Sequence, residues 1–139
     1  MSNGKVTMSL ALLVESDWSL LSHAFGVFRP DGYEIVVEGV PENALQIARR
    51  SRPKVIIVPA VVLDAWDKRL PGGVRFLLAS SAIIATADAE HAATALRKWA
   101  SMGCEILIVP LVHHFELYAA VESALDNTRH RQQEHTTAV

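Results

Sequence analysis

The sequence has little cysteine, no long apolar run and no strong charge of either sign. Its 139 residues include a single cysteine, Cys104, which excludes a disulfide framework and leaves a buried, unreactive thiol as the expectation. The formal net charge of −2 gives the chain no general attraction to nucleic acid or to an anionic membrane surface. Any contact of that kind would have to be local.

The sequence also shows neither the pattern of a secretory signal nor that of a membrane-spanning helix. Residues 1–9 are polar and do not show a cationic start followed by an apolar stretch. No run approaches the roughly 20 apolar residues that a helix needs to cross a bilayer. We therefore expect a cytoplasmic protein with no membrane contact. The length suits one domain over residues 1–127, and the polar residues 128–139 are expected to be a disordered tail or a helix extension.

Short apolar runs are what the sequence does contain, and they predict the strands of a parallel sheet. Val55–Val58 is an unbroken Val/Ile run, which is typical of a strand that helices cover on both faces. Similar runs occur at Leu10–Val14, Ser81–Ala85 and Glu105–Val109, and Tyr33–Val37 has the partial alternation of an edge strand.

Helical patterns lie between these runs. They begin at a cap formed by Ser16 or Asp17, at Pro41, at Val61, at Asp88 and at about His113. The helix from Asp88 is expected to present Ala92, Leu96, Trp99 and Ala100 to the core and to end at Gly103. The helix from Val61 is interrupted by Pro71-Gly72-Gly73, which fits a turn and not a phosphate-binding loop. The alternation predicts a three-layer α/β fold around a five-stranded parallel sheet.

In an open α/β sheet the chemistry lies at the carboxyl ends of the strands. The residues at these ends are Glu15-Ser16-Asp17, Pro59, Thr86 and Val109-Pro110. Histidines elsewhere are weaker candidates. We expect His91 to be solvated, with no other ligand at metal-binding spacing, and His113 and His114 to point about 100° apart on a helix, so that they do not converge on a metal.

Acidic residues after the first strand, Thr after the fourth and Val-Pro after the fifth make residues 6–127 resemble the receiver domain of bacterial two-component response regulators. The resemblance implies a flavodoxin-like fold with strand order 2-1-3-4-5. In that family, acids after the first strand hold Mg²⁺ and an aspartate that ends the third strand accepts a phosphoryl group. A Thr or Ser ends the fourth strand, and a Lys-Pro pair ends the fifth.

Only part of that site is present in this sequence. The resemblance puts Glu15 and Ser16 at the two acidic positions, Pro59 at the phosphoacceptor position, Thr86 at the hydroxyl position, Val109 at the lysine position before a retained Pro110, and Ile106 at the position of the switch aromatic. Proline has no nucleophilic oxygen, and valine cannot neutralise a phosphoryl group. Glu15 with a serine hydroxyl offers too little charge to hold Mg²⁺ tightly. The chain thus resembles a pseudo-receiver with no phosphoacceptor, metal or cofactor.

Two other aspartates could replace the missing residues of the phosphorylation site. Asp64 could be a displaced acceptor, but it lies five residues beyond the end of the third strand, where a phosphoryl group would be remote from Thr86. Asp17 could replace the acid lost at Ser16, although a helix-capping role explains it equally well. We therefore do not expect conventional aspartyl phosphorylation.

Two functions remain open. The first is a phosphorylation-independent signalling module that contacts a copy of itself or an effector protein through the last two helices and the last strand. The second is a small-molecule sensor whose apolar cleft is lined by Pro59, Ala87 and Val109, with Thr86 and Glu15 as its polar groups. We favour the first, because small apolar residues at strand ends usually pack. No Ser-His-Asp or Cys-His set and no flavin or cobalamin motif indicates an enzyme.

Overall fold

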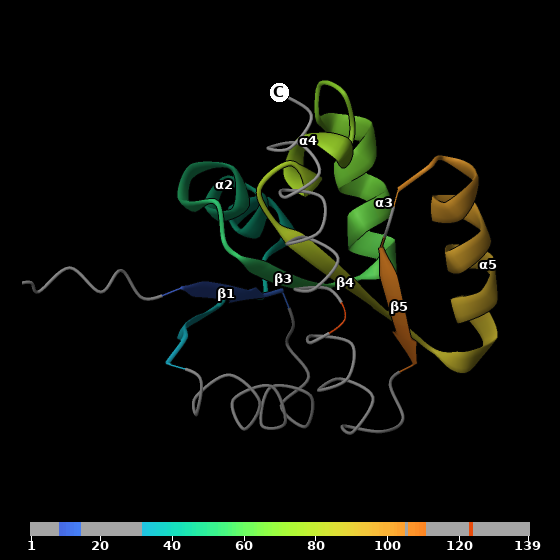
Figure 1. Cartoon of the computed structure of the whole chain (residues 1–139), viewed down its shortest axis with the longest axis horizontal. Coiled ribbons are helices and arrows are strands. Elements are labelled where there is room, and N and C mark those ends of the chain that lie inside the picture. The colour runs from blue at the N-terminus through green and yellow to red at the C-terminus, as the bar shows by residue number, and fades with distance from the viewer. Residues whose placement is uncertain (1–8, 15–31, 105, 111–122, 124–139) are drawn as a thin grey trace, which may run out of the picture.

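The computed structural model describes residues 9–14, 32–104, 106–110 and 123, which form a sheet of strands with helices packed against it (Figure 1). The elements are β1 (Leu10–Leu13), β2 (Glu34–Val37), α2 (Pro41–Ser51), β3 (Val55–Pro59), α3 (Ala60–Arg69), α4 (Arg75–Leu78), β4 (Ala82–Ala87), α5 (Ala89–Ser101) and β5 (Leu107–Pro110). The expected first and last helices, from Ser16 or Asp17 and from His113, lie outside these residues, as does the 128–139 tail. Among the described helices, none is both long enough and apolar enough to span a bilayer.

The sheet has five strands in the order β2-β1-β3-β4-β5, and every neighbouring pair is parallel. Figure 1 shows β3 near the centre, with β2 and β5 at the two edges. The expected α/β fold with a parallel sheet is therefore confirmed. β4 begins one residue later and ends two residues later than predicted, because Thr86 and Ala87 continue the ladder with β5.

The core explains why β1 and β3 contain no polar residue. Leu12, Ile56 and Ile83 belong to one buried cluster together with residues of α2, α3, α4 and α5. Residues that alternate with them, such as Ile57 and Ile84, point to the opposite face and are also buried, with 1% exposure or less. A strand that is buried on both faces needs apolar side chains at every position.

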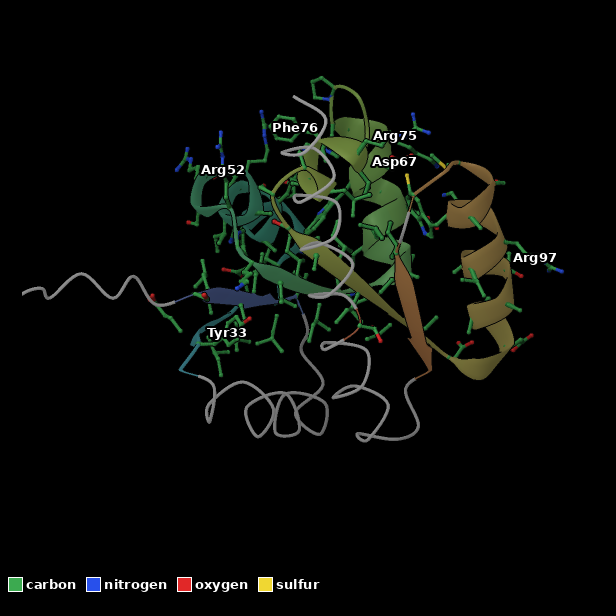
Figure 2. The ribbon with its side chains drawn as sticks, in the orientation of Figure 1. Tyr33, Arg52, Asp67, Arg75, Phe76 and Arg97 are labelled. Atoms are coloured by element: carbon green, nitrogen blue, oxygen red, sulfur yellow. The ribbon has the colours of Figure 1, made fainter. Side chains whose placement is uncertain are left out.

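The segment from 60 to 80 combines an intact helix with a tight turn. α3 runs without a break over ten residues and ends just before the predicted turn at Pro71-Gly72-Gly73. Gly72 and Gly73 have φ of +80° and +69°, a left-handed conformation that favours glycine. Oδ1 of Asp67 accepts a hydrogen bond of 2.8 Å from the backbone N–H of Val74, which ties the turn to α3 next to Arg75 (Figure 2).

Both ends of α5 follow the sequence prediction. Asp88 is the N-cap, and its Oδ1 accepts a hydrogen bond of 2.8 Å from the backbone N–H of His91. At the other end Gly103 has a φ of +72°, and the backbone N–H of Cys104 donates to the carbonyl of Trp99 at 3.0 Å. This pattern is a Schellman motif, which satisfies carbonyl groups at the end of the helix. Cys104 is buried, as expected, with 6% exposure.

The predicted inner face of α5 is partly wrong. Trp99 is fully buried, but Leu96 is 53% exposed and Ala100 is also exposed. The helix approaches the rest of the structure through the side that carries Ala92, Ala95 and Trp99, which follow helical spacing. Leu96 comes directly after Ala95 and points about 100° away from it. The large apolar side chain therefore lies on the outer surface of the helix.

Candidate functional site

Three strand-end residues meet in one row across β3, β4 and β5. Pro59 pairs with Thr86, and Thr86 pairs with Val109. The next pair in this direction is Ala87 with Pro110. The strand register thus brings together the positions that the resemblance assigns to the phosphoacceptor, the hydroxyl and the lysine. The acidic positions Glu15 and Ser16, with Asp17, lie outside the described residues.

Pro59 joins β3 to α3. It is the last residue of the strand and the N-cap of the helix, with φ −60° and ψ 140°. Proline accepts this φ readily but has neither a side-chain oxygen nor a backbone N–H. The helix consequently starts without a side-chain cap, and its first turn holds no acidic residue. No phosphoryl group can be attached to the residue at this position.

Thr86 is the polar side chain described in this row. It is only 3% exposed, and its hydroxyl oxygen has no hydrogen-bond partner among the residues that the structure describes. A buried hydroxyl group without a partner costs about 1–3 kcal/mol of stability. Such a group is explained by a strained site, by a functional site, or by a bound water molecule or ion.

A cleft of about 520 Å³ opens at this end of the sheet between α3 and α5, and Thr86 is one of its lining residues. Pro59, Ala60, Ala87 and Ala95 provide much of its apolar surface. Pro59, Ala87 and Thr86 line the cleft as expected, whereas Glu15 and the side chain of Val109, also expected there, lie outside what the structure describes. The contribution of α5 was not predicted. The helical spacing of His91, Ala95 and Lys98 was the signal that could have indicated it.

An ion pair links the two helices at the cleft. Nζ of Lys98 in α5 lies 2.6 Å from Oδ1 of Asp64 in α3, and both side chains line the cleft. Asp64 and Thr86 both line this cleft, Asp64 from α3 and Thr86 from the end of β4. The side chains of Lys98 and Asp64 are 39% and 42% exposed, so the pair adds at most about 1 kcal/mol to stability.

A second pair lies at the start of α5. Nδ1 of His91 is 2.6 Å from Oδ1 of Asp88. Hydrogen bonding to the Asp88 carboxylate raises the pKa of His91, and hydrogen bonds from the backbone and side chain of His91 lower the pKa of Asp88. Both side chains are well exposed.

Two carboxylates lie near His91, contrary to the prediction from the sequence. Ligand atoms of Asp88, Glu90 and His91 all lie within 4.8 Å of one another, so carboxylates do stand near this histidine. The i, i+3 spacing of Asp88 and His91 on one turn was the missed signal. The three groups are exposed, which agrees with the expectation of a solvated histidine.

Comparison with known proteins gives a match in structure only. No protein-family model matches the sequence, and no curated protein matches it. The signal receiver domain of a Luxo repressor protein from Vibrio parahaemolyticus is 20% identical with a TM-score of 0.61, over 91% of this chain and 96% of that one. An orphan response regulator of H. pylori is 14% identical with a TM-score of 0.60, over 84% and 96% of the two chains.

A further similar structure is the adenylate cyclase from Rhodopirellula baltica. It is 16% identical with a TM-score of 0.71, over 94% of this chain and 97% of that one. Sequence identities this low carry information about the fold and not about activity. The chain has the flavodoxin-like fold of response-regulator receiver domains.

Proposed function

We propose that this chain is a non-enzymatic, receiver-like signalling domain that acts in the cytoplasm through protein contacts and without aspartyl phosphorylation. The observation that carries the proposal is Pro59, which ends β3 in register with Thr86 of β4. Among the structural relatives, a receiver domain and an orphan response regulator support a signalling role. The acceptor position of the fold is occupied by a residue that cannot form an acyl phosphate.

Asp64 does not restore the missing nucleophile. Its carboxylate is held by the ammonium group of Lys98 on the helix pair and not at the end of a strand. An acceptor also needs groups that neutralise the charge of the transferring phosphoryl group, such as a bound metal ion and a cation aimed at it. Lys98 is already committed to Asp64, and it lies over the ring of Trp99 at 4.9 Å.

Intact-mass measurement tests the absence of phosphorylation. The protein is incubated with acetyl phosphate and Mg²⁺, and no stable phosphoryl adduct is expected. The variant Asp64→Asn, treated in the same way, shows whether Asp64 is the residue that carries any phosphoryl adduct that forms. An adduct that is present in the wild type and lost in Asp64→Asn would replace this proposal with a displaced acceptor.

The outer face of α5 is the described surface best suited to a protein contact. Ala93, Leu96, Arg97 and Ala100 are all exposed on it. Figure 2 shows Arg97 pointing away from the sheet. Leu96 exposes 53% of its surface beside small alanines, which allow another helix to approach closely. The sequence predicted a protein contact through the last two helices and the last strand, and α5 is the first of these two helices. The start of the last helix, at about His113, lies outside the described residues.

The charges on α5 fit a second copy of the same helix. Glu90 and Arg97 are both exposed and seven residues apart, so they lie on one side of the helix two turns from each other. In an antiparallel pair related by a two-fold axis, Glu90 of each copy faces Arg97 of the other. A two-fold interface must be complementary to itself, and this arrangement meets that condition.

Light scattering after size-exclusion chromatography tests the dimer. We expect Arg97→Glu to reduce dimerisation, because two like charges then oppose each other. The double variant Glu90→Arg/Arg97→Glu restores the opposite charges and should restore the dimer. Arg50→Glu, at an exposed position of α2, is the matched control and should leave the mass unchanged. A monomeric wild type, or a double variant as weak as Arg97→Glu, would contradict this interface.

A further inference from the structure

The cleft between α3 and α5 has the dimensions of a ligand site. Its volume of about 520 Å³ falls within the range of about 300–1,000 Å³ that is usual for small-molecule sites. We propose that this cleft binds a small, uncharged organic molecule with a largely apolar body and one hydrogen-bond acceptor such as a carbonyl oxygen. Binding there would not require any phosphate chemistry and is independent of the dimer interface proposed above.

The apolar body follows from the lining. Pro59 and Ala60 at the α3 side, Ala87 on the floor and Ala95 at the α5 side are short, and together they leave an open volume that larger side chains would have filled. Val61, next to Ala60, is 75% exposed at the cleft and adds an apolar rim. An apolar ligand would remove this surface from water, which is the main source of affinity in such clefts.

The absence of charge on the ligand follows from the ionisable groups around the cleft. Asp64 is paired with Lys98 at 2.6 Å, and Asp88 is paired with His91 at 2.6 Å. Each ionisable side chain of the lining thus has its partner within the lining itself. The four groups together carry no net charge when His91 is protonated and one negative charge when it is neutral, so they offer no net attraction to an anionic ligand. A cationic ligand would lose its hydration in an apolar cleft where both carboxylates are already engaged.

The hydrogen-bond acceptor follows from Thr86. Its hydroxyl group is the buried side-chain oxygen without a partner among the described residues of this wall. That oxygen is covered when the cleft is empty, so a contact with a ligand requires the side chain to turn from one staggered rotamer to another. A carbonyl oxygen in the cleft would then accept the hydrogen bond that the threonine cannot make within the described structure.

Two matched dyes test the size and charge of the ligand. Nile red is neutral and carries a carbonyl oxygen, whereas Nile blue has nearly the same ring system with a cationic nitrogen in place of that carbonyl. We expect the full chain to bind Nile red at one saturable site with a blue-shifted emission, and to bind Nile blue at least tenfold more weakly. An anionic dye, anilinonaphthalene sulfonate, should also bind at least tenfold more weakly. Failure to bind Nile red, or tighter binding of either charged dye, would overturn the proposal.

Substitutions test the location. Ala95→Phe should fill the cleft and weaken the binding of Nile red at least tenfold, whereas Ala65→Phe, at an exposed position of α3 outside the cleft, should leave it unchanged. Circular dichroism checks that both variants are folded. If Ala95→Phe does not fold, amide shifts of the wild type on adding Nile red decide: shifts centred on residues 59–64 and 86–98 support the site, and shifts centred elsewhere overturn it.

Thr86→Val tests the hydrogen bond. Valine has nearly the same shape as threonine but no hydroxyl group, so we expect Nile red to bind about threefold to tenfold more weakly. The melting temperature of the free protein should not fall, because the variant removes a buried group that has no hydrogen-bond partner among the described residues. A purely structural role of the hydroxyl would leave dye affinity unchanged and lower the melting temperature, and that outcome would refute the role given to Thr86.

Discussion

The turn after α3 gives a sharp test of how the structure is held together, through the variant Gly73→Ala. The φ of +69° at Gly73 is unfavourable for any residue with a Cβ atom, at about 1–2 kcal/mol. A Cβ atom there would also overlap Oδ1 of Asp67. That oxygen accepts the hydrogen bond of 2.8 Å from the backbone N–H of Val74, so Asp67 would have to leave it.

The expected magnitude follows from these two effects. Losing a hydrogen bond to a charged acceptor costs about 1.5–3 kcal/mol, which adds to the backbone strain. Alanine in place of glycine returns about 0.4–1 kcal/mol by reducing the entropy of the unfolded chain. We therefore expect Gly73→Ala to lower the free energy of unfolding by about 3 kcal/mol. The assay is denaturant unfolding followed by circular dichroism.

Gly72 provides the matched control. Its φ of +80° is just as unfavourable for alanine, but nothing lies within 4 Å of the position that a Cβ atom would take. Gly72→Ala should therefore cost only about 1 kcal/mol, from backbone strain alone. In an Asp67→Ala background the overlap is removed, and Gly73→Ala should then cost no more than Gly72→Ala does. Equal losses for the two glycines in the wild type would refute the reasoning.

Three further predictions concern single side chains. Arg52 has a φ of 47° after the end of α2, so Arg52→Gly should raise the free energy of unfolding by up to about 1 kcal/mol; a loss in urea unfolding would contradict this. The buried hydroxyl of Ser81 donates to the carbonyl of Pro53 at 2.6 Å, so Ser81→Ala should lower the free energy of unfolding by about 1–3 kcal/mol in the same assay. Asp88→Asn keeps a good N-cap but removes the carboxylate whose hydrogen bond and charge raise the pKa of His91, so this pKa should fall toward its ordinary 6.5 in an NMR titration. A pKa of His91 that Asp88→Asn leaves unchanged would count against the pair. In the wild type, the stabilisation from the protonated His91 is present below about pH 6.5 and is lost as the pH rises through the raised pKa.

Local sequence was sufficient for the order of the described strands and for much of their bounds, but it did not indicate α4. The unbroken Val/Ile run of β3 identified a buried parallel strand, because only a strand covered on both faces excludes polar residues at every position. Asp88 and Gly103 marked the two ends of α5, since capping depends on the few residues at a helix end. That β3 ends in a proline, which has no nucleophilic oxygen, was also visible without coordinates, because it depends on residue chemistry alone.

Other features were decided by tertiary structure. Which side of α5 faces inward could not be read from periodicity, because an alanine-rich helix offers several apolar faces, and packing through Ala95 and Trp99 left Leu96 exposed. The cleft depends on the separation of α3 and α5, and the pairing of Asp64 with Lys98 joins residues 34 positions apart. The sequence by itself determined which side chains stand at the strand ends and what chemistry those residue types allow. The packing of two helices decided the shape of the surface there, because distances between separate elements are set by the whole core.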